Sequence, residues 1–207
     1  MWVADLIYNA KVDSVSFENG MLKSVKAGIT EYEADEFVVA TGSWSPVIGN
    51  QLGLKIPVQA GKGYSLTIVN PKVQIPLPVI LEDAKVAITP LPGFLRIAGT
   101  MEIAGLDLSI NQLRVEGIKE AVRQNIPQIE ESELAEAKVW AGLRPCTPDG
   151  LPIIGKTEKW KNLTLATGHA MLGISMAAVT GKLVEGIISK EEKQVDLNAV
   201  SPMRFGV

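Results

Sequence analysis

Residues 36–45 read EFVVATGSWS, a short apolar run that passes into small residues and then into a turn. The run around Val38 and Val39 is unbroken by polar side chains, which predicts a strand buried on both faces of a sheet. Ala40 and Gly42 follow with little or no side chain, so the backbone behind this strand could approach a ligand closely. Alone, the pattern is equally typical of an ordinary exit from a strand into a loop.

The sequence before this stretch predicts short strands over residues 6–8, 11–17 and 21–26. Asn19-Gly20 separates the last two, and an Asn-Gly pair between two strand-like runs is a strong signal for a hairpin turn.

After Pro46 the sequence changes, because prolines interrupt β-type runs at 64–69, 79–81, 86–89 and 94–98. Proline lacks an amide donor, so this spacing favours an irregular, antiparallel sheet rather than a parallel one.

An amphipathic helix is predicted over residues 109–125, with Ser109 and Gln112 as a capping box and Pro127 beyond its end. Its apolar face is formed by Ile110, Leu113, Ile118, Ala121 and Val122. Strands are expected at 138–143 and 163–166. The most apolar tract, residues 171–189, is expected to form a buried helix from 172 onward.

The composition excludes several classes of protein. The chain has 207 residues, of which 46% are hydrophobic and 21% charged, which supports a folded core rather than a disordered tail. Its net charge of −3 disfavours binding to nucleic acid. No signal peptide is apparent at the start, no apolar run reaches the roughly 20 residues of a membrane span, and the lone Cys146 fits a reducing compartment. A cytoplasmic location is therefore expected.

The stretch Trp140–Gly155 contains an arginine, Arg144, between a tryptophan-containing strand and a turn braced by Pro145 and Pro148. A guanidinium is permanently charged and presents its donors as a planar fork, which suits capture of a carboxylate. The same pattern is also typical of an arginine paired with a surface acid.

The stretch 167–174, TGHAMLGI, predicts a strand end, a glycine-containing turn and a helix N-terminus. Unpaired amides and the positive end of the helix dipole favour an anion or an electron-rich carbonyl. His169 is the only histidine, and a structural role is more typical of such a residue than proton transfer. One His and one Cys make no patterned metal site, and the chain contains neither a P-loop nor a G-x-G-x-x-G turn.

Taken together, these segments resemble the glycine/D-amino-acid oxidase family of flavoproteins, and its D-amino-acid dehydrogenase branch in particular. The stretches that carry the resemblance lie at 39–46, 61–67, 96–102, 140–155 and 167–173.

The resemblance implies an α+β fold with a mixed or antiparallel substrate-domain sheet and an incomplete, Rossmann-like part of an FAD-binding domain. It assigns residues 1–45 to the FAD-binding domain, 46–143 to a substrate-binding domain and 144–207 to the return into the FAD-binding domain. It covers only about the C-terminal half of a family member. We therefore expect a fragment, or a subunit of a split enzyme, that lacks the N-terminal FAD-binding segment and holds no tightly bound FAD alone.

The resemblance also implies roles for single residues. Arg144 would bind the carboxylate of a small amino-acid substrate, with Tyr64 and Lys62 nearby, and His169 is the weakest candidate for catalysis. Residues expected to contact the FAD cofactor are Val12, Ala40, Thr41, Gly42, Trp44, Gly142, Gly168, His169, Ala170, Met171, Leu172, Gly173 and Ile174.

The implied reaction is oxidation of the C–N bond of a D-amino acid to an imino acid, with hydride transfer to flavin N5. Two alternatives stay open: a related flavin amine oxidoreductase acting on hydroxyproline, opines, glycine or sarcosine, and a non-catalytic interaction subunit. No nucleic-acid partner is expected, and contact with the inner membrane is expected only for an intact, quinone-coupled enzyme.

Overall fold

The computed structural model describes residues 4–191 and 195–207. The chain divides into two compact units. We call Gln59–Arg144 the central unit, and Met1–Val58 together with Pro145–Val207 the discontinuous unit. The chain contains both helices and strands, and its sheets are antiparallel or mixed, which confirms the predicted mixed fold class.

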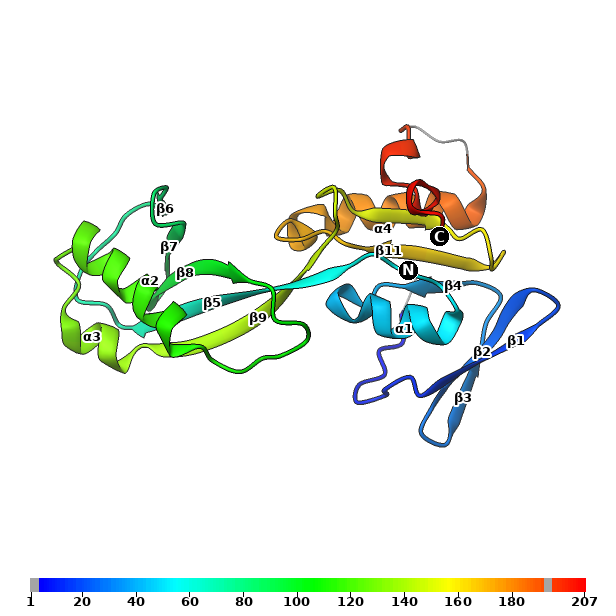
Figure 1. Cartoon of the computed structure of the whole chain (residues 1–207), viewed down its shortest axis with the longest axis horizontal. Helices are drawn as coiled ribbons and strands as arrows, with labels where there is room; N and C mark the ends of the chain where they lie inside the picture. The colour runs from blue at the N-terminus through cyan, green and yellow to red at the C-terminus, as the bar shows by residue number, and fades with distance from the viewer. Residues whose placement is uncertain (1–3, 192–194) are drawn as a thin grey trace. The chain divides into compact units, whose positions relative to one another are not determined.

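The central unit is built on a five-stranded sheet of order β6-β7-β8-β5-β9 (Figure 1). Neighbouring strands from β6 to β5 run antiparallel, as the proline spacing predicts. Two helices, α2 and α3, pack against strands of this sheet. The bounds are β5 (Gln59–Val69), β6 (Val79–Leu81), β7 (Val86–Leu91), β8 (Phe94–Glu102), α2 (Gln112–Asn125), α3 (Glu131–Glu136) and β9 (Lys138–Cys146), whose last two residues belong to the discontinuous unit.

The core of the central unit lies between the sheet and the two helices. Leu66, Ile88 and Ile97 from the strands are fully buried, and they share one apolar cluster with Ile118 of α2 and Leu134 of α3. Burying each such side chain stabilises the fold by about 1.5–3 kcal/mol, so this cluster fixes the sheet on which the predicted substrate residues stand.

Helix α2 begins later than the predicted residue 109. Asn111 is the N-cap, and its side chain accepts a hydrogen bond from the amide of Leu113 at 3.1 Å. The hydroxyl of Ser109 instead donates to the carboxylate of Asp107, so the predicted Ser109–Gln112 capping box is wrong. The predicted apolar face is confirmed at Ile118, Ala121 and Val122 but is wrong at Leu113, which is 85% exposed, while Val115 is buried.

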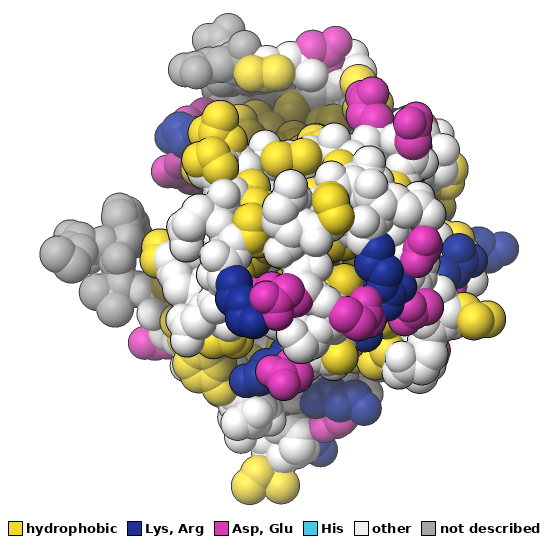
Figure 2. All heavy atoms as spheres, turned by 90° about the vertical axis from the view of Figure 1, so that its left-hand side faces the viewer, with side chains coloured by type: hydrophobic (Ala, Val, Ile, Leu, Met, Phe, Trp, Pro, Cys, Tyr) yellow, Lys and Arg dark blue, Asp and Glu magenta, His cyan; other side chains and the backbone are white. Residues whose placement is uncertain are grey.

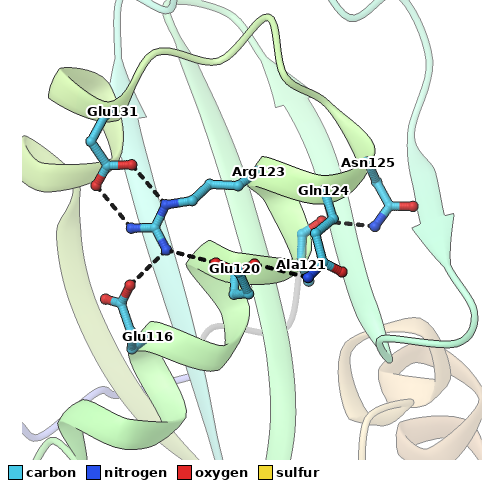
Figure 3. Close-up of polar contacts among 7 residues, drawn as sticks. All are labelled: Glu116, Glu120, Ala121, Arg123, Gln124, Asn125 and Glu131. Atoms are coloured by element: carbon cyan, nitrogen blue, oxygen red, sulfur yellow. Dashed lines mark hydrogen bonds and ion pairs between the residues drawn. The ribbon is translucent and has the colours of Figure 1, made fainter.

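Ion pairs join α2 to α3 on the surface (Figure 3). The guanidinium of Arg123 donates to both carboxylate oxygens of Glu131, at 2.7 and 2.8 Å, and to Glu116 at 2.6 Å. These hydrogen bonds hold the pKa of Arg123 above its ordinary value and hold the pKa of Glu131 below it. The sequence did not predict α3, whose six residues are too short for a periodic pattern.

The discontinuous unit contains two three-stranded sheets. One has the order β1-β2-β3 and is antiparallel; in the other, β10-β11-β4, strand β11 pairs parallel with β4 and antiparallel with β10. The bounds are β1 (Ser14–Glu18), β2 (Met21–Ala27), β3 (Thr30–Glu33), β4 (Phe37–Val39), α1 (Ser45–Leu52), β10 (Ile153–Lys156), β11 (Leu163–Thr167) and α4 (Gly173–Ser189), with short 3-10 turns η1 (Gly42–Trp44), η2 (Asn198–Val200) and η3 (Pro202–Phe205).

One buried asparagine connects the two sheets. The side chain of Asn162 accepts from the amide of Leu22 at 2.9 Å and donates to the Leu22 carbonyl at 2.8 Å and to the Asp35 carbonyl at 3.1 Å. It thereby satisfies backbone groups of β2 and of the segment that leads into β4. The predicted Asn19-Gly20 turn is confirmed, since both residues have positive φ, at 52° and 75°.

Several predictions are wrong in this unit. Residues 6–8 form no strand and are exposed. The predicted domain boundary at residue 46 stays a prediction; the compact central unit begins at Gln59, because helix α1 and the residues after it, Leu54 and Ile56, pack into the core of the discontinuous unit. Strand β4 is not buried on both faces, since Val38 is largely exposed while Val39 is buried.

Helix α4 also differs from expectation, because it is apolar but largely exposed. Ile174 is 94% exposed and Val179 is about half exposed, and Thr180 is the buried residue of this helix. Most apolar helices of this length bury one face. The described residues of the discontinuous unit therefore leave an apolar face of α4 uncovered.

The surface mixes charges of both signs. On the face drawn in Figure 2, Lys and Arg side chains lie beside Asp and Glu side chains rather than forming a field of one sign. Within residues 4–191 and 195–207, no helix has the length and apolar character needed to cross a membrane, and no group of His, Cys, Asp and Glu is arranged to hold a metal ion.

Candidate functional site

One candidate region, within the discontinuous unit, lies where β4 and β11 end. Because the two strands are parallel and Val39 pairs with Leu165, their carboxyl ends meet at the same edge of the sheet. The predicted FAD-contacting residues 40–42 follow β4, and 168–170 follow β11. Ligands of open α/β sheets bind at such an edge. The fold thus brings these two predicted groups together.

A cluster of hydroxyl groups fastens this edge. The Ser45 hydroxyl donates to the Gly42 carbonyl at 2.7 Å and lies 2.7 Å from the Thr167 hydroxyl. The Thr167 hydroxyl also lies within donating distance of the Gly42 carbonyl, at 3.3 Å, so the two hydroxyls share that acceptor and either can donate to the other. Thr41 also donates to Ser45, at 3.2 Å. Ser45 is fully buried, so these bonds tie the loop after β4 to the end of β11 in a low-dielectric environment.

The turn between β11 and α4 depends on an unusual backbone. Gly168 has φ of 80°, and a Cβ at this position would lie 2.5 Å from the Thr147 methyl carbon. Ala170 is also left-handed, at φ 48°, and its amide donates to the Pro145 carbonyl at 2.9 Å. The segment that follows Arg144 therefore braces the turn and sets where α4 begins.

The N-terminus of α4 has no side-chain cap among the residues that the structure describes, with Leu172 at the N-cap. The first amides of a helix have no partner within it. Met171, Leu172 and Ile174, which surround these amides, are 57–94% exposed. Uncapped amides beside exposed apolar side chains fit a flat, apolar cofactor with an electron-rich edge, as FAD would present. Gly173 adds no side chain there, and a Cβ at this position would lie 3.6 Å from the Cβ of His169.

His169 has a local partner on α4. Its Nε2 lies 3.0 Å from the hydroxyl of Thr180, and burial lowers the pKa of the imidazole. The neutral ring is therefore favoured near neutral pH, which suits a residue that holds α4 against its preceding turn. A catalytic role for His169 stays a prediction.

A separate candidate region lies within the central unit, around Arg144 near the end of β9. The guanidinium lies against the backbone of Gly63: a Cβ on Gly63 would be 2.1 Å from Nη1 of Arg144. Nη1 also donates to the carbonyl of Thr100 at 3.3 Å. Arg144 is thus held at the point where β5 and β8 change register. Its role in carboxylate binding stays a prediction.

Lys62 and Tyr64, the other predicted substrate residues, are buried in polar networks. Lys62 is 1% exposed, and its ammonium donates to Asp107 at 2.8 Å and to the Ser109 carbonyl at 3.0 Å. The hydroxyl of Tyr64 donates to Glu102 at 2.7 Å. These bonds fasten the loop between β8 and α2, and contact with substrate stays a prediction for both residues.

These hydrogen bonds shift the pKa values of the charged groups that take part in them. The hydrogen bond to Asp107 raises the pKa of Lys62, and Lys62, followed by Ser109, holds the pKa of Asp107 well below its ordinary value. The hydrogen bond from Tyr64 likewise lowers the pKa of Glu102. All three charged groups therefore stay ionised near neutral pH.

Three other predicted cofactor residues lie outside the segments 40–42 and 168–174. Val12 is half-buried just before β1. Trp44 is about half exposed at the end of η1. Gly142 of β9 lies under the indole of Trp140, since a Cβ there would be 2.1 Å from that ring. Their contact with FAD stays a prediction.

Four residues that support the two candidate regions were not predicted from the sequence: Ser45, Thr167, Gly63 and Thr100. A glycine inside a β-type run, as at 63, signals a bulge or a close approach, and this signal was available. The hydroxyl cluster had no such signal, because Ser45 and Thr167 are far apart in the sequence.

Comparisons with known proteins agree with this geometry. Residues 4–186 match the family described as FAD dependent oxidoreductase. The chain is 40% identical over 190 residues to a D-amino acid dehydrogenase of Vibrio vulnificus strain YJ016, covering 91% of this chain and 45% of that protein. It is 38% identical over 201 residues to the D-amino acid dehydrogenase of Vibrio atlanticus, covering 96% and 48%. The chain thus spans about half the length of these curated relatives.

Solved structures show the same fold. Glycine oxidase from Geobacillus kaustophilus superposes with a TM-score of 0.81 at 25% identity, covering 93% of this chain and 51% of that one. L-proline dehydrogenase from P. horikoshii gives a TM-score of 0.82 at 25% identity, covering 95% and 54%. With its parallel strand edge, its uncapped helix and a family match over most of its length, the chain belongs to the FAD-dependent oxidoreductase family that includes the D-amino acid dehydrogenases.

Proposed function

We propose that this chain is the substrate-binding and flavin-contacting part of an enzyme that oxidises the C–N bond of D-amino acids to imino acids. The observation that carries the proposal is Arg144, whose guanidinium is held at the register change of β5 and β8 in the central unit. The choice of D-amino acids is supported by the 40% identity to a D-amino acid dehydrogenase.

The role of Arg144 is to bind and orient the substrate carboxylate. A planar fork of donors makes two parallel hydrogen bonds to a carboxylate, which fixes the position of the neighbouring α-carbon. Such orientation contributes several kcal/mol to a reaction, because the substrate no longer needs to find the reactive geometry by diffusion. In the reaction, the Cα–H bond breaks and its electron pair leaves as hydride, the lone pair of the neutral amine forms the C=N bond, and the resulting iminium ion releases a proton to solvent to give the imino acid.

FAD, when bound, would supply a two-electron acceptor, with flavin N5 as the proposed acceptor of the hydride. The residues that would hold it are those at the shared edge of β4 and β11, with the α4 amides toward the pyrimidine edge, where they would stabilise negative charge. The oriented amides of Gly173 and Ile174 would supply that stabilisation without side-chain ionisation. No protein base is needed for a free amine, so His169 keeps its structural contact with Thr180.

The partner of this chain, in the same proposal, is an N-terminal FAD-binding segment with a glycine-rich dinucleotide turn. Two observations support it: the relatives are about twice as long as the region they share with this chain, and the apolar face of α4 is uncovered. Docking of such a segment would cover Ile174 and Val179. Contact with a membrane would then be a property of the assembled enzyme.

A second substrate class is favoured by a separate observation. Glycine oxidase and L-proline dehydrogenase share the fold at TM-scores above 0.8, so secondary or unsubstituted amines are alternatives to D-amino acids. A purely structural, non-catalytic subunit is the remaining alternative.

The test is reconstitution. The chain is co-expressed with an N-terminal segment that carries the dinucleotide turn, the complex is purified, and flavin absorbance is recorded before and after anaerobic addition of D-alanine, D-proline, glycine or hydroxyproline. The proposal predicts retained flavin that D-alanine or D-proline bleaches, and little bleaching in the Arg144→Gln variant. Flavin that only glycine or hydroxyproline bleaches would support the second class, and failure to retain flavin would contradict the proposal.

A further inference from the structure

The strands β5 and β8 contain a bulge directly under Arg144. Lys62 pairs with Glu102 and Tyr64 pairs with Gly99, so Gly63 alone faces both Thr100 and Met101. An extra residue on one strand bends it locally and re-aims nearby groups. Such bulges are frequent beside functional sites.

The bulge is held in a costly conformation at Thr100. This residue has φ of 66°, in the left-handed region that β-branched residues strongly avoid. Its hydroxyl oxygen is buried and has no hydrogen-bond partner among the described residues. Strain of this kind persists only where the surrounding structure enforces it, and it concentrates at functional sites.

The bulge also creates the surface on which the guanidinium lies. The Thr100 carbonyl accepts from Nη1 of Arg144 at 3.3 Å. A Cβ on Gly63 would lie 2.1 Å from Nη1 and 2.5 Å from both Cζ and Nη2. Its three nearest neighbours would all belong to Arg144, and Gly63 is not among the residues with positive φ. A side chain at 63 would therefore displace the guanidinium of Arg144 from its present position.

We propose that Gly63 is a positioning residue for Arg144: together with the Thr100 carbonyl it forms a seat that fixes the guanidinium plane for carboxylate binding. This inference rests on the proposed function of Arg144 for its consequence in catalysis. The seat itself is a property of the central unit. It explains why a strained threonine and a side-chain-free strand position lie opposite each other.

The test compares Gly63→Ala with Gly117→Ala. Gly117 is a matched control, because it lies on α2 in the same unit and a Cβ there meets nothing within 4 Å. In the chain itself, the rate of phenylglyoxal labelling at Arg144 is measured by peptide mass spectrometry, with Arg96 as internal reference. Gly63→Ala should raise that rate by about tenfold, the equivalent of one lost charge-assisted hydrogen bond. Gly117→Ala should leave it unchanged.

In the flavin-loaded complex, Gly63→Ala should raise KM for D-alanine by about tenfold, while Gly117→Ala does not. In the Arg144→Lys background, Gly63→Ala should change KM little further, because the compact lysine ammonium does not lie flat against the backbone of residue 63. Equal labelling rates in Gly63→Ala and the unsubstituted chain would overturn the inference, even if the complex oxidises D-amino acids. A complex without that activity would overturn the proposed function. The labelling result would still show whether Gly63 positions the guanidinium of Arg144.

Circular dichroism shows whether the Gly63→Ala chain still folds. If Gly63→Ala alone unfolds, adding Arg144→Lys should restore the fold, because the overlapping group is then gone. Failure of that second substitution to restore it would show that position 63 serves the backbone, and would overturn the inference.

Discussion

Replacing Gly168 by alanine should destabilise the discontinuous unit strongly. The left-handed backbone at φ 80° costs an L-residue about 1–2 kcal/mol. The new Cβ would also lie 2.5 Å from the Thr147 methyl carbon, an overlap of the kind that costs about 1–3 kcal/mol. The free energy of unfolding should therefore fall by about 2–5 kcal/mol. Urea unfolding followed by circular dichroism measures this change.

Two further variants separate the backbone contribution from the steric contribution to the loss of stability in Gly168→Ala. Thr147→Ser removes the methyl group but keeps the hydroxyl that donates to the Leu151 carbonyl at 2.8 Å. In that background Gly168→Ala should cost only the backbone part, about 1–2 kcal/mol. Gly181→Ala is the control, since a Cβ there meets nothing within 4 Å and alanine favours the helix by about 0.5–1 kcal/mol. A loss in Gly168→Ala no larger than the experimental error would refute the reasoning about the turn.

Three further outcomes are expected. Ser45→Ala should lower the free energy of unfolding by about 1–3 kcal/mol in urea, because the buried Thr167 hydroxyl and the Gly42 carbonyl each lose a hydrogen-bond partner; an unchanged midpoint would contradict this. Lys62 lowers the pKa of Asp107, so the stabilisation of the fold by the Asp107 carboxylate is present above the ordinary carboxyl pKa and is lost as pH falls below it. Asp107→Asn should therefore flatten the acid limb of a pH–stability curve. An unaltered limb would count against the ion pair. Burial lowers the pKa of His169, so the unfolded chain binds the proton more readily than the folded chain, and the free energy of unfolding should fall as pH drops below about 6.5. In His169→Gln that decline should be smaller. An identical decline would exclude the histidine as its cause.

The local elements could largely be predicted from the sequence. The Asn19-Gly20 turn, the strands of the central unit and helix α4 within one residue of its start follow from turn chemistry and apolar spacing. Helix α1 was missed because its Pro46 reads as a strand breaker, whereas the structure uses that proline in the first turn of a helix, where no amide donor is needed.

The tertiary features could not be predicted in the same way. Apolar spacing cannot tell whether a helix is covered by this chain or left open, so α4 was expected to be buried. The glycine signal at position 63 indicates a close approach but not its partner, and only the fold shows that the partner is Arg144. The Ser45–Thr167 contact joins residues of different strand ends, and it depends on the parallel pairing of β4 with β11.

The most direct test of the account compares D-alanine with D-alaninamide, which lacks the carboxylate, as substrates of the flavin-loaded complex. The account predicts that the preference in kcat/KM for D-alanine falls by about a hundredfold in Arg144→Gln, the equivalent of two charge-assisted hydrogen bonds. Equal losses with both substrates would contradict it, because Arg144 would then support the enzyme without recognising the carboxylate.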